Sequence, residues 1–123
     1  MIIAVDFDGT LCMNAWPAIG PPRKPVIAYL RQRKQNGDKL ILWTNRTGER
    51  LSEAVSWCSE HGLEFDTVNE NLPEMIGRFG SDCRKVYADI YLDDKAMNPD
   101  IAAKALDMTA ERNRFRRTVR RGK

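Results

Sequence analysis

Two short runs of almost uninterrupted apolar residues constrain the fold of this chain most strongly. They are residues 1–5 (MIIAV) and residues 39–43 (KLILW). Apolar runs of this length, without alternating polar residues, are typical of parallel strands that are covered on both faces of a sheet. We therefore expect both runs to be buried strands of a parallel sheet.

Further strand and helix patterns alternate along the chain. A third strand is predicted over residues 86–92 (VYADIYL) and a short fourth one over residues 64–68 (EFDTV). Between these strands, apolar residues recur at the spacing of a helix. Gly37, Gly62 and Gly80 are well placed to end three of the predicted helices. The predicted helices cover residues 25–35, 48–61 and 72–79, followed by a last helix that begins after Asn98 or Pro99. This order predicts an α/β protein, a three-layer sandwich around a central parallel sheet with right-handed crossovers.

Length, composition and charge restrict the class of protein. A chain of 123 residues, with 42% hydrophobic and 30% charged residues, is expected to form one soluble domain over residues 1–123. Its first apolar stretch of five residues is too short for a signal peptide or a membrane span, so no membrane partner is expected. Three cysteines without a C-x-x-C pair favour neither a disulfide framework nor a zinc site, and they suit the cytoplasm.

The net charge of +3 is unevenly distributed along the chain. Residues 100–123 contain eight Lys or Arg against three Asp or Glu, a balance of +5, so the preceding residues sum to −2. The basic character therefore belongs to a C-terminal helix or tail at about residues 100–123.

Two aspartates follow the first strand directly, in the sequence DFDGT at residues 6–10. Residues i and i+2 of an extended chain point to the same side, so Asp6 and Asp8 are expected to converge while Phe7 turns away. Two carboxylates held close together repel each other unless a cation lies between them or one takes up a proton.

The other two main strands also end in polar residues. Thr44, Asn45 and Arg46 follow the second strand, and Asp93 and Asp94 follow the third. The carboxyl ends of parallel strands lie at one edge of the sheet, where such folds bind ligands. Carboxylates gathered there suit Mg²⁺, which prefers oxygen ligands together with substrate phosphates. Lys85 would reach the same place if the loop before the third strand curls back.

These motifs, taken in order, resemble those of a known superfamily. DFDGT at residues 6–10, the apolar run ending in Thr44, Lys85, and the strand ending in Asp93-Asp94 look like the four motifs of the haloacid dehalogenase-like (HAD) hydrolases, phosphatase branch. The match spans residues 2 to about 97 and leaves out the tail. The resemblance implies a Rossmann-like sandwich and a Mg²⁺-dependent phosphomonoester hydrolase.

The resemblance also implies roles for single residues. Asp6 would be the nucleophile that forms an aspartyl-phosphate, and Asp8 the general acid that later acts as the base. Mg²⁺ would be held by Asp6, Asp93 and the backbone carbonyl of Asp8, with Asp94 as a direct or water-mediated ligand. The residues expected to orient the phosphate and the rest of the substrate are Thr44, Lys85, Thr10, Asn45 and Arg46.

Several of these roles could fall to a second residue. Asp89 competes for a metal-binding role, and Arg84 could take the place of Lys85. Asn45 and Arg46 would otherwise be a helix cap and a surface residue. The side chains of Trp16, Arg23 and Lys24 lie in or just after residues 11–24, which are predicted to form a small flap. They either touch the leaving group or face solvent.

No segment of the chain is long enough to hold the cap domain that usually selects substrates in this superfamily. Residues 11–24 and 69–84 are the possible insertion points, so we expect a capless member with an open site. A small phosphate ester, such as a sugar phosphate or a nucleotide, is the expected substrate. Without a cap, either a bulky substrate or the neighbouring subunit of a homo-oligomer would close the site. A second hypothesis is a phosphatase of nucleic-acid ends, bound through the basic tail. A third is a receiver-like phospho-acceptor module, although such modules carry the acceptor where this chain has Thr44.

Overall fold

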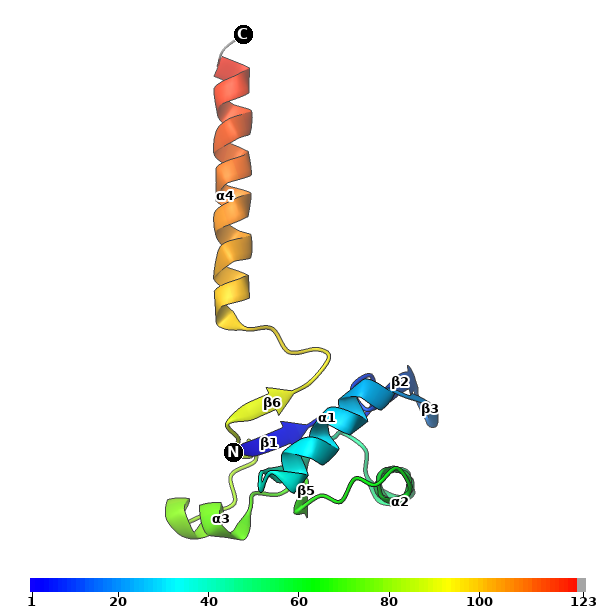
Figure 1. Cartoon of the computed structure of the whole chain (residues 1–123). Coiled ribbons are helices and arrows are strands. Elements are labelled where there is room, and N and C mark those ends of the chain that lie inside the picture. Colours follow the sequence, from blue (N-terminus) through cyan, green and yellow to red (C-terminus); the bar gives the residue numbers. More distant parts are fainter. Residues whose placement is uncertain (122–123) are drawn as a thin grey trace.

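A four-stranded parallel sheet forms the centre of the computed structural model (Figure 1). The structure describes residues 1–121, except for the side chains of residues 110 and 117–121. The strands are β1 (Ile2–Val5), β4 (Lys39–Leu42), β5 (Thr67–Val68) and β6 (Ile90–Leu92), in the order β5-β4-β1-β6. The helices are α1 (Lys24–Gln35), α2 (Gly48–Glu60), α3 (Pro73–Phe79) and α4 (Pro99–Arg121).

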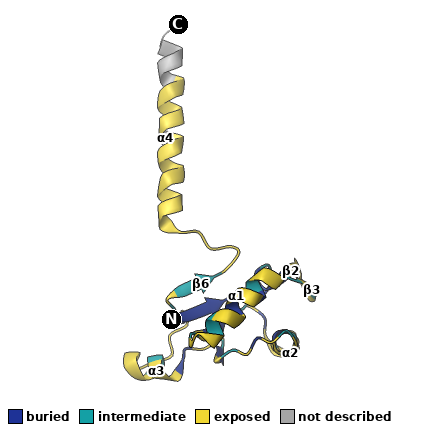
Figure 2. Ribbon diagram, viewed as in Figure 1, coloured by how far each residue is buried: buried dark blue, intermediate teal, exposed yellow. Residues whose placement is uncertain are grey.

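The two central strands are buried on both faces, as their apolar runs predict. Ile3 and Val5 of β1 pack on one face with Leu30 of α1 and Cys58 of α2, while Ala4 faces the opposite side. That second face is covered by the segment around α3, and its core members are Ile2, Ala4, Ile41, Leu72 and Val86. The parallel α/β arrangement flanked by helices is therefore confirmed, and Figure 2 shows β1 as its buried centre.

Two predicted strands are shorter than expected because side chains replace the hydrogen bonds of the sheet. The strand predicted over residues 86–92 begins only at Ile90. Before it, Tyr87 N–H donates to Asn71 Oδ1, and Ile2 N–H donates to the Asp89 carboxylate. The strand predicted over residues 64–68 is reduced to β5, since the Asp66 carboxylate accepts the Leu40 N–H.

The flap predicted over residues 11–24 is an antiparallel hairpin of β2 (Cys12–Ala15) and β3 (Ala18–Pro22). It comes directly after the turn that follows β1, and Trp16 lies at its tip, between the strands. Gly20 is required in the hairpin because a Cβ atom there would collide with the backbone carbonyl of Met13. In the described chain, this hairpin is all that lies between β1 and α1, apart from the turn itself.

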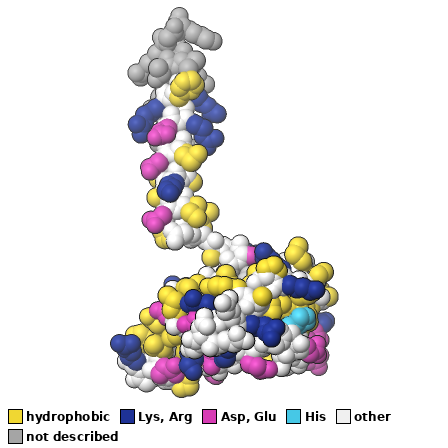
Figure 3. Space-filling model, in the orientation of Figure 1, with side chains coloured by type: hydrophobic (Ala, Val, Ile, Leu, Met, Phe, Trp, Pro, Cys, Tyr) yellow, Lys and Arg dark blue, Asp and Glu magenta, His cyan; other side chains and the backbone are white. Residues whose placement is uncertain are grey.

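The last helix differs from all the others in its surroundings. α4 extends away from the sheet and its flanking helices (Figure 1), and each of its described side chains is exposed. Figure 3 shows acidic side chains along its first half and basic ones beyond them. Among the helices that the structure describes, none is both long and apolar enough to cross a membrane.

Candidate active site

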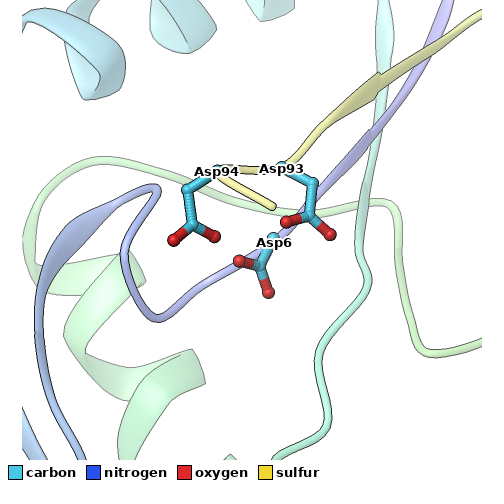
Figure 4. A group of neighbouring side chains, drawn as sticks. All are labelled: Asp6, Asp93 and Asp94. Atoms are coloured by element: carbon cyan, nitrogen blue, oxygen red, sulfur yellow. The ribbon is translucent and has the colours of Figure 1, made fainter. Parts of the chain in front are cut away.

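Three carboxylates meet at the carboxyl edge of the sheet (Figure 4). Asp6 follows β1, and Asp93 and Asp94 follow β6, which is the hydrogen-bonded neighbour of β1. The Asp6 N–H continues this ladder by donating to Leu92 O at 2.9 Å. One carboxylate oxygen from each aspartate lies within 4.8 Å of the other two, which is a spacing that a single cation can bridge. We call these three residues the acidic cluster.

The pKa of Asp6 shows that the acidic cluster lacks a compensating positive charge from the described residues. Burial raises the pKa of Asp6 to about 6, and the Asp93 charge and a hydrogen bond with Asp94 act in the same direction. The Phe7 N–H and the Thr10 hydroxyl lower the pKa of Asp6 by smaller amounts. The cluster therefore favours a positive charge, and a hard divalent cation such as Mg²⁺ fits an all-oxygen donor set.

Thr10 and Gly9 hold the acidic cluster together. The Thr10 hydroxyl donates to Asp6 Oδ2 at 3.2 Å and accepts the Asp94 N–H at 3.1 Å. Gly9 has a φ of +84°, and a Cβ atom on it would collide with the Asp94 carboxylate. Thr10 was expected to bind substrate, but it is buried with its hydroxyl held between two aspartates, so its role is to position them.

Asp8 does not join Asp6, contrary to the expected convergence of the two carboxylates. Both Asp8 oxygens accept hydrogen bonds from Arg46, from Nε at 2.8 Å and from one terminal nitrogen at 2.7 Å. Arg46 was predicted at the substrate or on the surface, yet it is only 1% exposed. Its remaining N–H groups donate to the backbone carbonyls of Pro17, Ala18 and Arg50.

Two aromatic rings enclose the same guanidinium group. Arg46 Cζ lies 5.0 Å from the ring centroid of Phe7 and 4.9 Å from that of Trp16. Arg46 thereby ties the hairpin to the end of β1, and Trp16 is stacked on it while 58% of its surface stays exposed. We call Arg46, Asp8, Phe7 and Trp16 the arginine centre.

A cavity of about 370 Å³ lies between the acidic cluster and the arginine centre. Thr44 and Asn45 border it from the end of β4, as predicted, and Arg46 borders it with its donors already occupied. Asn69 orients Thr44 by accepting its N–H at 2.8 Å, from a backbone with a φ of +55° that asparagine tolerates. The residues lining the cavity are Asp6, Asp8, Asn14, Trp16, Thr44, Asn45, Arg46, Asp93 and Lys95.

The lysine of this cavity is not the one predicted. Lys85 lies over the ring of Tyr91, with Nζ 5.3 Å from the ring centroid, and lines a separate cavity of about 300 Å³. Arg84, the second candidate for this role, does not line the cavity at the acidic cluster either. Lys95 does so instead, and its N–H donates to the Asp93 carboxylate at 2.9 Å. Its position directly after Asp93-Asp94 was the available sequence signal.

Asp89 and Arg23 each support the backbone at one end of β1. Asp89 accepts the Ile2 N–H at 2.7 Å at the end of β1 opposite to the acidic cluster, so it is not a ligand of that cluster. Arg23 donates to the Gly9 carbonyl at 2.8 Å, which supports the turn after β1. Asn14, from the hairpin, was not predicted to border the cavity, since nothing in a short irregular segment indicates which side chain faces it.

Fold and site together define a parallel α/β protein with a cluster of three aspartates at the carboxyl edge of its sheet. The chain is similar to a solved structure, that of a conserved protein coded by a locus of Bacteroides thetaiotaomicron, with 35% identity and a TM-score of 0.69. The match covers 89% of this chain and 91% of the other. The chain therefore belongs to the same family as that conserved protein. No family model and no curated protein matches the chain.

Proposed function

We propose that this protein is a Mg²⁺-dependent phosphomonoester hydrolase of the HAD type, with a capless Rossmann-like sandwich as its scaffold. The observation that carries the proposal is the meeting of Asp6, Asp93 and Asp94 beside a cavity that Asp6 and Asp93 line. Phosphoryl transfer is catalysed mainly by charge neutralisation and alignment. A carboxylate that bonds to phosphorus beside a cation site is what such a reaction requires.

In the proposed reaction, a carboxylate oxygen of Asp6 attacks phosphorus and the bond to the leaving oxygen breaks. Thr10 fixes the carboxylate through its hydrogen bond to Asp6 Oδ2. Water then attacks phosphorus, so that phosphate is released and the Asp6 carboxylate is restored. Asp6, Asp93 and Asp94 would hold the cation, which supplies positive charge against the phosphoryl oxygens when bound.

Asp8 is proposed to donate the proton to the leaving oxygen and to take one from the attacking water. It lines the cavity, although both of its oxygens accept hydrogen bonds from Arg46. Each carboxylate oxygen has two acceptor positions, so the ion pair leaves room for a proton on the cavity side. Thr44, Asn45 and Lys95 border the same space and are suited to contact phosphoryl oxygens.

The cavity supports a small substrate. A volume of about 370 Å³ is at the small end of ligand sites, which run from roughly 300 to 1,000 Å³. Trp16 offers an exposed ring on its rim, with the amide of Asn14 nearby. A phosphorylated sugar or nucleotide would place its phosphate at the acidic cluster and its ring against Trp16.

The test is hydrolysis of para-nitrophenyl phosphate with Mg²⁺ and with EDTA. We expect activity only with Mg²⁺, and Asp6→Asn should lower it by at least about a thousandfold, because loss of a nucleophile removes most of covalent catalysis. Asp107→Asn is the matched control: it makes the same change on exposed α4 and should leave activity intact. Full activity of Asp6→Asn, or activity in EDTA, would contradict the proposal.

Two further measurements distinguish this enzyme from the other two hypotheses. A receiver-like module would retain one phosphoryl group per chain without turnover, which intact-mass measurement would detect after treatment with a small phosphoryl donor. A phosphatase of nucleic-acid ends would prefer phosphorylated oligonucleotides to sugar phosphates and nucleotides. That preference would be lost on deletion of residues 110–123.

A further inference from the structure

α4 is a long helix without a covering surface. Its 23 residues span about 35 Å at a rise of 1.5 Å per residue. Every described side chain on it is exposed (Figure 2), whereas α1 and α2 each bury residues in the core. Isolated helices are marginal in water, and most helices in proteins are stabilised by the packing of an apolar face. We therefore expect such a helix to pack against a partner.

An apolar stripe runs along one side of α4. Ile101, Ala105, Met108 and Phe115 follow one another at steps of four, three and seven residues, which return to the same side of a helix. The side chains of Ile101, Met108 and Phe115 are 58%, 61% and 70% exposed. We call these four residues the α4 stripe. An exposed row of large apolar side chains at this spacing is the pattern of a helix that pairs with another helix.

The charges on α4 decide which partner and which orientation fit. Residues 99–111 contain Asp100, Asp107 and Glu111 against Lys104, a balance of −2, whereas residues 112–121 contain six arginines and no acid. Two parallel copies would place the arginines side by side, whereas two antiparallel copies place each arginine-rich half against an acidic half. A nucleic acid would be repelled by the acidic half and would leave Ile101 and Met108 uncovered.

We propose that α4 is a homodimerisation helix, which pairs antiparallel with α4 of a second copy of this chain through the α4 stripe. In the register that fits best, Met108 lies next to its counterpart, and Ile101 packs against Phe115 of the second copy. The small Ala105 is then level with Glu111 of the second copy, and Arg112 beside it can extend its long side chain along the helix while its guanidinium stays in water. This pairing is independent of the proposed hydrolase activity.

Antiparallel pairing also has a consequence for the site. It places the two sheets at opposite ends of the paired helices. The arginine-rich end of each helix comes to the start of α4 in the other copy, which follows Asp94 by only five residues. The dimer would therefore bring positive charge toward the side of the molecule on which the acidic cluster opens.

The first test is the mass of the full chain in solution, by sedimentation equilibrium. We expect twice 14.1 kDa for the natural chain and 14.1 kDa for Met108→Glu, which puts a charge in the middle of the α4 stripe. Leu106→Glu is the matched control, since Leu106 is 71% exposed and lies on another side of the same turn. It should remain dimeric. A monomeric natural chain, or equal effects of the two substitutions, would overturn the proposal.

The second test fixes the orientation by disulfide trapping in a Cys83→Ser background, because Cys83 is the exposed cysteine. A mixture of Ile101→Cys chains and Phe115→Cys chains should form the mixed disulfide on mild oxidation. Parallel pairing would give only disulfides between identical chains and would overturn the antiparallel arrangement. Loss of the dimer on addition of a duplex oligonucleotide would identify α4 as a polyanion-binding helix instead.

Discussion

The acidic cluster and the arginine centre occupy the same end of β1, but their charges are arranged in opposite ways. In the cluster, Asp6 lies against two more carboxylates and no described cation is paired with it. In the arginine centre, Asp8 faces a guanidinium that is almost completely buried. Two aspartates separated by one residue thus have different tasks. Among the described side chains, Asp6 has no positive partner, whereas Asp8 is paired with a guanidinium that also fastens the hairpin.

If the proposed function is correct, this short motif serves both binding and stability. The carboxylate ligands of a cation site repel one another when no cation is bound, and this repulsion destabilises the fold locally. The neighbouring ion pair, with hydrogen bonds to three backbone carbonyls, holds the walls of the cavity in place. Three substitutions separate these two roles, and their expected effects on stability decrease in size and finally change sign.

The largest effect is expected for Arg46→Ala. Removal of one partner of a buried ion pair typically costs about 3–5 kcal/mol, and we expect a loss at the lower end of this range because Asp8 is partly exposed. Here the hairpin also loses its hydrogen bonds to the guanidinium and Trp16 loses its stacking partner. Urea unfolding should therefore show a large decrease in the free energy of unfolding. Arg46→Lys keeps the charge but not the two parallel hydrogen bonds. Its free energy of unfolding should therefore lie between those of the natural chain and of Arg46→Ala.

The matched control is Arg50→Ala. Arg50 forms an exposed ion pair with Glu53 one turn further along α2, and such pairs contribute no more than about 0.5 kcal/mol. If Arg46→Ala cost as little as Arg50→Ala, the arginine centre would not be a stabilising element.

A smaller loss is expected for Gly9→Ala, which disturbs the cluster through the backbone. An L side chain at positive φ costs roughly 1–2 kcal/mol, and the added Cβ atom must also displace the Asp94 carboxylate. We expect a decrease of about 2 kcal/mol in the free energy of unfolding and weaker binding of Mg²⁺, measured by calorimetry. Gly77→Ala is the control because Gly77 lies in α3 with open space around it. It should be neutral or slightly stabilising, and a similar loss at both glycines would contradict the role of Gly9.

The sequence alone predicts the acidic cluster better than it predicts the arginine centre. Asp6, Asp93 and Asp94 could be placed together because strand pairing brings the residues after β1 and β6 to one edge. Arg46 could not be recognised as buried, because its burial depends on a hairpin that folds back over it and on the rotation of Asp8 toward it. In a polar stretch of sequence such as TNRTG, an arginine is predicted to be a surface residue.

The loop before β6 was mispredicted for the same physical reason. It is fixed by hydrogen bonds with side chains distant in sequence: the Tyr87 N–H donates to Asn71 Oδ1, and Asn71 Nδ2 donates to Cys83 O. Periodicity carries no information about such contacts, so the strand start and the position of Lys85 were both wrong. The boundaries of α1, α2 and α3 were predicted to within one residue, because apolar spacing and the glycines Gly37, Gly62 and Gly80 mark them locally.

Of the three substitutions that separate the two roles, Asp6→Asn in EDTA is expected to have the smallest effect and is the only one expected to stabilise the protein. Without a cation, this change removes a carboxylate that Asp93 and Asp94 repel, and two unit charges about 4 Å apart repel each other by about 1 kcal/mol in water. The variant should therefore be about 1 kcal/mol more stable than the natural chain. With Mg²⁺ at tenfold its dissociation constant, the natural chain should gain about 1.4 kcal/mol and the variant much less.

The order of stability of the two proteins should then reverse between EDTA and Mg²⁺, which thermal unfolding under both conditions would show. Asp107→Asn removes the same charge from α4, away from the cluster, and should follow the natural chain in both. If Asp6→Asn were less stable than the natural chain even in EDTA, the Thr10 hydrogen bond would outweigh the repulsion. Asp6 would then belong with Asp8 as a stabilising residue, and the contrast between the two aspartates would fail.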